Sequence, residues 1–220
     1  MTKRHFDDEL IFLRGRILTM GGLCEEMIHE AVKILLARDP SFGDSVARNE
    51  ERVNDLHIEI DDRCLKMIAL NQPAAEDLRL ITAAMKINSD LERVADQAVN
   101  VAETSAYLLK LPTLKAGHIP RMVDLATGML KDSLDAFAHK DVDLARSVIQ
   151  RDDEEDRLKS EVFTELLQIM QTDASTIQRA LEIILISRNL ERIADHATNI
   201  AEDVIFMVLG KDIRHKSGKE

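Results

Sequence analysis

LERVADQAVNVAE at 91–103 and LERIADHATNIAE at 190–202 are two copies of one motif, identical at nine of thirteen positions. In both copies apolar residues recur at every third or fourth position, which is typical of a helix with one buried face. A long motif that occurs once in each half of a chain indicates a duplicated structural unit. We therefore expect two related helical halves.

Helical periodicity extends outward from these motifs over almost the whole chain. Runs such as Met27, Ile28, Ala31 and Leu35 place apolar side chains on one helix face. Only four prolines and eight glycines interrupt a composition rich in helix-forming residues. The sequence predicts an all-α fold with six helical segments. Their expected ranges are 7–38, 41–70, 74–109, 120–139, 141–170 and 174–209.

The longest break in the helical pattern is LPTLKAGHIP at 111–120, which holds two of the four prolines and indicates a connector. Residues 18–37 also match the apolar positions of 120–139, although only three of these twenty residues are identical. We therefore predict two tandem three-helix bundles related by internal duplication, with the domains at 1–111 and 112–220. Gly21 and Gly22 inside the first helix indicate either a close helix contact or a kink.

Charge and cysteine content limit the classes of function. The net charge of -11 argues against direct binding to nucleic acid or to anionic lipid. Cys24 and Cys64 form neither a CxxC motif nor a Cys/His cluster, so a reducing compartment is expected. The N-terminus has no apolar signal-peptide core, and the apolar run at 204–209 is too short to span a membrane. These features predict a cytoplasmic protein.

Each repeated motif places four oxygen-bearing side chains on a narrow stripe of its helix, within about 80° of arc at about 100° per residue. All four residue types recur unchanged in the second copy, whereas the rest of the two halves has diverged. The candidate metal ligands are Glu92, Asp96, Asn100, Glu103, Glu191, Asp195, Asn199 and Glu202.

Two interpretations of this stripe remain open. It could face water, with Arg93 and Arg192 neutralising it through exposed ion pairs. However, like charges four residues apart destabilise a helix, and their repetition suggests that something else favours them. An all-oxygen array suits hard or borderline cations rather than metals selected by thiolate ligands. The expected cofactors are divalent or ferric ions, with Fe, Mn, Mg, Ca and Zn as candidates.

No catalytic motif competes with a binding role. The sequence contains no GxSxG, P-loop or GxGxxG motif. His196 beside Asp195 is the nearest candidate for a general base, but Gln97 takes its place in the first copy. A binding and signalling protein is therefore favoured over an enzyme. The alternatives are a di-metal carboxylate helical-bundle enzyme and a plain helical scaffold without metal.

The chain resembles the PhoU family along almost its whole length. The resemblance rests on FDDEL at 6–10, LTMGG at 18–22, QPAAEDLR at 72–79, the paired LERVAD and LERIAD, and GKDIRH at 210–215. In one departure, Ala95 and Ala194 stand where many members have glycine before the aspartate, which leaves the carboxylates unchanged.

This resemblance implies a fold, a function and partners. The implied fold is a pair of spectrin-like three-helix bundles, and a homodimer is expected. The implied function is negative regulation of the phosphate regulon and modulation of phosphate uptake. The protein would link the Pst phosphate transporter, through its ATPase PstB, to the sensor kinase PhoR, and would meet the membrane only through these partners. Some members carry multinuclear metal clusters on E/DxxxD motifs, which here correspond to Glu92, Asp96, Glu191 and Asp195.

Overall fold

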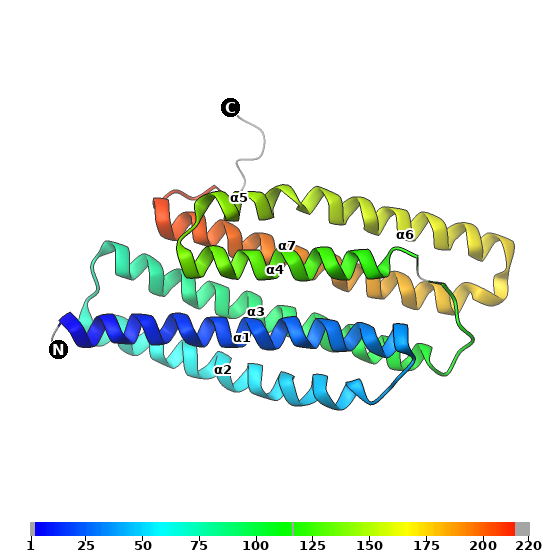
Figure 1. Ribbon diagram of the computed structural model, residues 1–220, viewed down its shortest axis with the longest axis horizontal. Helices are drawn as coiled ribbons and strands as arrows, with labels where there is room; N and C mark the ends of the chain where they lie inside the picture. Colours follow the sequence, from blue (N-terminus) through cyan, green and yellow to red (C-terminus); the bar gives the residue numbers. More distant parts are fainter. Residues whose placement is uncertain (1–2, 116, 214–220) are drawn as a thin grey trace.

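The computed structural model describes residues 3–115 and 117–213, which are almost entirely helical (Figure 1). The predicted all-α class is confirmed, and five of the six predicted segments are single α-helices with ends within a few residues of the expected ones. Arg214 and His215 of the GKDIRH motif lie outside the described residues. The elements are α1 (Lys3–Ala37), α2 (Phe42–Asn71), α3 (Ala75–Leu108), α4 (Ile119–His139), α5 (Val142–Gln150), α6 (Asp152–Thr172), a 3₁₀ turn (Ala174–Thr176) and α7 (Ile177–Leu209).

Helices α1, α2 and α3 form an up-and-down bundle in the first half of the chain. Arg38 and Gln72 have left-handed backbone conformations, with φ of 52° and 46°, and reverse the chain after α1 and α2. α2 packs against α1 and α3 and forms one long edge of the molecule (Figure 1). The helices are amphipathic, and within the described residues none combines the length and the apolarity of a membrane span.

The second half repeats this arrangement with α4, the α5–α6 pair and α7. The predicted helix over 141–170 is not continuous, because Arg151 separates α5 from α6. The Arg151 guanidinium donates to Asp132 of α4 at 2.6 Å, and four acidic residues at 152–155 fill the first turn of α6. Acidic side chains stabilise a helix N-terminus, so this run favours the start of a new helix.

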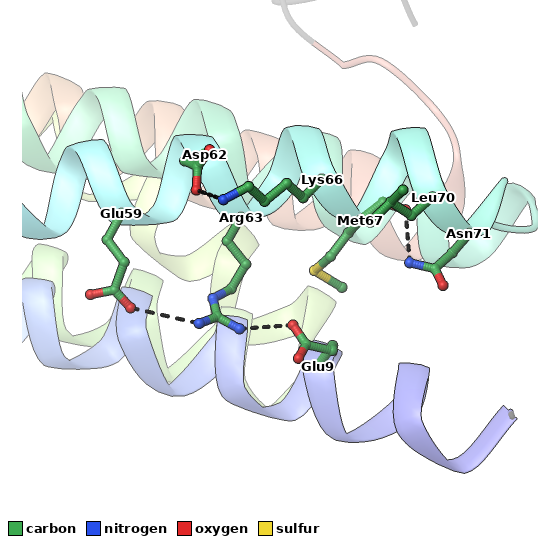
Figure 2. Close-up of a pocket in the computed structure, with 8 residues that line it drawn as sticks. All are labelled: Glu9, Glu59, Asp62, Arg63, Lys66, Met67, Leu70 and Asn71. Atoms are coloured by element: carbon green, nitrogen blue, oxygen red, sulfur yellow. Dashed lines mark hydrogen bonds and ion pairs between the residues drawn. The ribbon is translucent and has the colours of Figure 1, made fainter. Parts of the chain in front are cut away.

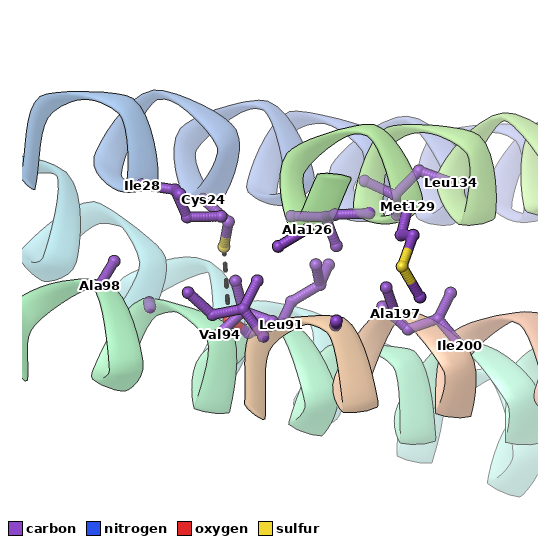
Figure 3. Packing of buried hydrophobic residues seen from close by; sticks show 14 of the residues in the cluster. Cys24, Ile28, Leu91, Val94, Ala98, Ala126, Met129, Leu134, Ala197 and Ile200 are labelled. Atoms are coloured by element: carbon purple, nitrogen blue, oxygen red, sulfur yellow. Dashed lines mark hydrogen bonds between the residues drawn. The ribbon is translucent and has the colours of Figure 1, made fainter. Parts of the chain in front are cut away.

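Both halves contribute to one continuous core. α3 and α7 run antiparallel and make the most extensive packing of any helix pair, while α1 also contacts α4. Figure 3 shows Cys24 and Leu91 from the first half in the same layer as Met129 and Ala197 from the second. Polar contacts cross the same interface, with Lys86 Nζ lying 2.9 Å from Asp203 Oδ1. The two bundles are therefore packed side by side along their third helices.

The two adjacent glycines of α1 have different roles. A Cβ at Gly21 would overlap the Cδ1 of Leu134, so this glycine permits the close approach of α1 and α4. A Cβ at Gly22 would meet nothing within 4 Å. Both residues lie within the unbroken helix α1, so Gly21 marks a close helix contact rather than a helix break.

Candidate acidic metal-binding sites

In the second half, the carboxylates of the repeated motif on α7 face the acidic start of α6. Lys159 of α6 connects the two helices, because its Nζ lies 2.6 Å from Asp156 Oδ1 and 2.6 Å from Glu191 Oε1. Asp152 reaches α7 at a second point, where its Oδ1 accepts a hydrogen bond from the Thr198 hydroxyl at 3.3 Å. We call the carboxylates of this region, together with Lys159, the α6–α7 acidic site. Its carboxylates are Asp152, Glu155, Asp156, Glu191 and Asp195.

Glu155 is the least compensated group of the α6–α7 acidic site. It is 1% exposed, and neither carboxylate oxygen has a hydrogen-bond partner among the described residues. Burial, followed by repulsion from Glu191 and other neighbouring carboxylates, raises its pKa to about 8. A buried carboxylate without a partner is costly, so this position calls for a proton or a bound cation.

Two further groups of the site share this excess of negative charge. Burial first, and then Glu191 and Asp152, raise the pKa of Asp195 to about 6. Burial also raises the pKa of Asp152, against the opposing effect of its hydrogen bond from Thr198. For Lys159, burial opposes protonation, but the hydrogen bonds to Asp156 and Glu191 outweigh it and raise the pKa. The ammonium group of Lys159 thus lies at a position that favours positive charge.

The equivalent place in the first half lies between α2 and α3 and carries less charge. Arg93 lies between the two α3 carboxylates, with Nε 3.5 Å from Glu92 Oε2 and Nη1 3.3 Å from Asp96 Oδ2. Burial first, and then repulsion from Asp96 and Glu103 of α3, raise the pKa of Glu50 on α2. We call this group, Glu50, Glu92 and Asp96, the α2–α3 acidic site.

The remaining predicted ligands are not gathered with these carboxylates. Asn199 donates to Asp90 of α3 at 3.3 Å, and Asp90 also lies 2.9 Å from the imidazole of His196. Asn100 is exposed and Glu202 is half-buried. The last glutamate of each motif stands three turns, or about 16 Å, from the first, so one ion cannot bind both.

The donor set fits a hard metal ion better in the second half than in the first. The α6–α7 acidic site offers five carboxylates from two helices, including the unpartnered Glu155. In the described part of the chain, however, no three Asp, Glu, His or Cys side chains converge closely enough to hold an ion. Binding would require the Lys159 side chain, which is one-third exposed, to turn outward and release Asp156 and Glu191.

Sequence reasoning missed the ligand candidates that come from the second helix of each half. These are Glu50, Asp152, Glu155 and Asp156. A signal for them was available, because the register that places Leu56 on Leu158 also places Glu50 on Asp152 and Asn54 on Asp156. The same register places the buried Val53 on Glu155, so at this buried position only the second half has a carboxylate.

Comparison with known proteins gives matches along almost the whole chain. The model of the family described as the PhoU domain matches twice, at residues 17–105 and 119–204. A phosphate-specific transport system accessory protein PhoU homologue of Pseudomonas putida is 39% identical over 214 residues, covering 96% of this chain and 84% of the relative. A homologue of the same name from Caulobacter vibrioides is 36% identical and covers 99% and 96%.

Two solved structures share this fold. The crystal structure of PhoU from Pseudomonas aeruginosa superimposes with a TM-score of 0.90 at 38% identity, covering 94% of this chain and all of that one. The crystal structure of the phosphate transport system regulatory protein PhoU from Streptococcus pneumoniae gives a TM-score of 0.87 at 28% identity, with 94% and 98% covered. The similarity therefore includes both helical bundles.

Proposed function

This chain belongs to the PhoU family, and from that membership we propose that it is an accessory protein of a phosphate-specific transport system. In this role it is a negative regulator of the phosphate regulon and a modulator of phosphate uptake. It acts through protein contacts rather than through catalysis, as a cytoplasmic homodimer that links the transporter ATPase PstB to the sensor kinase PhoR.

One observation carries this proposal, which is similarity over both PhoU domains rather than over one shared module. The relatives that match 96% and 99% of this chain are themselves matched over most of their own length. Both relatives are named as accessory proteins of phosphate-specific transport. Both PhoU domains are present in this chain.

The proposal is tested by deleting the gene in its host and following a reporter for a phosphate-controlled promoter. We expect the reporter to stay on in rich phosphate and to be switched off again when this chain is supplied from a plasmid. Affinity purification after crosslinking should recover the transporter ATPase or the sensor kinase. Reporter output that responds normally to phosphate in the deletion strain would exclude a regulatory role.

We further propose that the acidic sites bind divalent or ferric ions and that the α6–α7 acidic site binds more tightly. Asp152, Asp156, Glu191 and Asp195 supply oxygen ligands there, with Glu155 behind them. A bound cation would neutralise the carboxylates that now repel one another across α6 and α7. In the α2–α3 acidic site Arg93 already supplies part of that neutralisation. Bound metal would thus stabilise the second bundle more than the first.

A further inference from the structure

An apolar groove runs along the outer surface between α6 and α7, next to the α6–α7 acidic site. It includes a hollow of about 410 Å³ whose lining includes Phe163 of α6 and Ile184 and Arg188 of α7. Further large apolar side chains are exposed on the same two helices outside the hollow, with Leu167 39%, Leu181 50% and Leu185 46% exposed. We call the hollow residues Phe163, Ile184 and Arg188, together with Leu167, Leu181 and Leu185, the α6–α7 groove.

The three-helix fold does not require this surface to be apolar. In the first half, the positions equivalent to Phe163, Leu181 and Leu185 hold Asp61, Thr82 and Lys86. Two of these polar residues bond within the chain, since Asp61 accepts from Asn88 at 2.9 Å and Lys86 pairs with Asp203. At these three positions the first half is polar where the second half exposes a large apolar side chain, whereas Leu65 and Leu167 are apolar and exposed in both halves. Clustered exposed apolar side chains are typical of binding sites on folded proteins.

Arg188 supplies a free positive charge inside the groove. Its guanidinium is exposed and forms no hydrogen bond or ion pair with any residue that the structure describes. Glu191 also lines the hollow, but Lys159 already holds it at 2.6 Å. The hollow between α1 and α2 is different (Figure 2), because Arg63 there pairs with Glu9 and Glu59, and Lys66 pairs with Asp62.

Shape and charge together define what fits. Two neighbouring helices with apolar walls accept a third helix that presents apolar side chains at i, i+3 or i+4, and i+7. An acidic side chain on that helix would pair with Arg188 in a charge-assisted contact. A second copy of this chain, bringing the same groove, offers Arg188 against Arg188 and no free carboxylate from the groove lining. A different partner therefore fits better.

We propose that the α6–α7 groove docks an amphipathic helix of a partner protein, and that an acidic residue of this helix pairs with Arg188. The existence of a partner protein for this groove rests on the proposed function, since a regulator of this kind acts through partners. The ability of the groove to bind a helix depends only on the groove itself. Failure of the binding test therefore leaves the reporter experiment on the deletion strain unaffected.

The test uses this chain and two fluorescently labelled helical peptides. Both peptides carry leucines along one helix face, and they differ only at the residue next to the last leucine of that face, which is glutamate in one peptide and lysine in the other. Fluorescence anisotropy should show that the glutamate peptide binds more tightly. Arg188→Glu should lower the affinity for the glutamate peptide by roughly tenfold or more and raise the affinity for the lysine peptide, as expected for a charge pair. Leu167→Ser and Leu185→Lys should each weaken both peptides.

Leu65→Ser is the matched control, because Leu65 is the first-half equivalent of Leu167 and is 59% exposed. It should leave peptide binding unchanged, and circular dichroism should show every variant folded. The proposal is overturned if Leu65→Ser weakens peptide binding as much as Leu167→Ser does. It is also overturned if Arg188→Glu does not come to prefer the lysine peptide, or if the parent chain binds neither peptide. Conversion of a dimer into a monomer by Leu185→Lys in analytical ultracentrifugation would assign the groove to a second copy instead.

Discussion

At the scale of single residues, Glu155 and Val53 show how the duplicated halves have diverged in chemistry. Both side chains are buried at equivalent positions of α6 and α2, but only Glu155 brings a carboxylate into the core. Its burial beside Glu191 and Asp152 raises its pKa to about 8, so the folded chain holds a proton there at neutral pH. The unfolded chain, where Glu has its ordinary pKa of about 4.3, does not.

This difference predicts how stability depends on pH when chelator keeps metal away. Because the folded pKa of Glu155 is raised, the folded state binds the extra proton, and unfolding free energy falls as pH rises from about 4.5 to about 8. Asp195, with its pKa raised to about 6, adds to the fall at the lower end of this range. Glu155→Gln should therefore stabilise the protein at pH 8 by up to a few kcal/mol and change it little at pH 4.5.

Urea unfolding between pH 4.5 and pH 8.5 measures this effect. Asp153→Asn provides the control, because Asp153 is the exposed neighbour on the same helix turn. Its stability should follow the pH profile of the parent chain. Equal profiles for the parent chain and Glu155→Gln would mean that Glu155 is not the source of the pH dependence.

A second residue-scale prediction concerns metal. Saturating Mn²⁺ or Fe should stabilise the chelator-treated protein, by about 2.7 kcal/mol when the free ion exceeds its dissociation constant a hundredfold. Asp195→Asn should remove most of this gain, because it takes a ligand from the better site. Asp96→Asn should remove less, because Arg93 already neutralises the α2–α3 acidic site.

Thermal unfolding with and without metal measures this stabilisation, and elemental analysis by mass spectrometry should agree with it. Bound metal should fall more in Asp195→Asn than in Asp96→Asn, with helicity unchanged in both. If the parent chain binds no metal, or if the double variant binds as much as the parent, the acidic stripes are solvated surfaces and the proposal of metal binding is wrong.

The residues of the candidate sites could be predicted only in part. Glu191 and Asp195 stand out because they recur in a motif that is local in sequence. Asp156 could not be joined to them by periodicity, since that contact depends on how α6 packs against α7. The turning of Asn199 toward Asp90 likewise depends on the packing of α3 against α7, which helix patterns do not specify.

At the scale of elements, helix existence follows from local patterns, whereas helix continuity depends on tertiary contacts. The five unbroken segments follow from apolar spacing and from turn residues, which include proline at 40 and 73 and aspartate at 141 and 173. The break at Arg151 was missed because an arginine there does not mark a turn or a helix N-cap. It depends on the hydrogen bond from Arg151 to Asp132 on another helix, together with the acidic first turn of α6.

Adjacent glycines in α1 give a prediction at this scale. Gly21→Ala should destabilise the chain by roughly 1–3 kcal/mol, because the added methyl group overlaps Leu134, which is buried and has little room to move. Gly22→Ala should stabilise it by up to about 1 kcal/mol through helix propensity, since nothing occupies the space above it. Thermal and urea unfolding measure both. Equal effects of the two substitutions would show that α1 and α4 do not approach closely at Gly21.

At the scale of the whole molecule, duplication of sequence and independence of folding are separate properties. The domains predicted at 1–111 and 112–220 meet in the connector between α3 and α4. However, α3 and α7 pack against each other more extensively than any other pair. The ion pair of Lys86 with Asp203 and the hydrogen bond between Asp90 and His196 also join the two halves. A core built this way favours cooperative unfolding of the whole chain.

Hydrogen exchange can test whether the halves unfold together. Ile60 in α2 and Leu166 in α6 are buried, and neither α2 nor α6 touches the other half within the described residues. Ile60→Ala and Leu166→Ala should each cost about 2–5 kcal/mol. If the shared α3–α7 interface makes the chain one cooperative unit, each substitution lowers the exchange free energy of the slowest amides equally in α3 and in α7. Losses confined to the substituted half would instead establish 1–111 and 112–220 as separate folding units, because the effect would then stop at the interface.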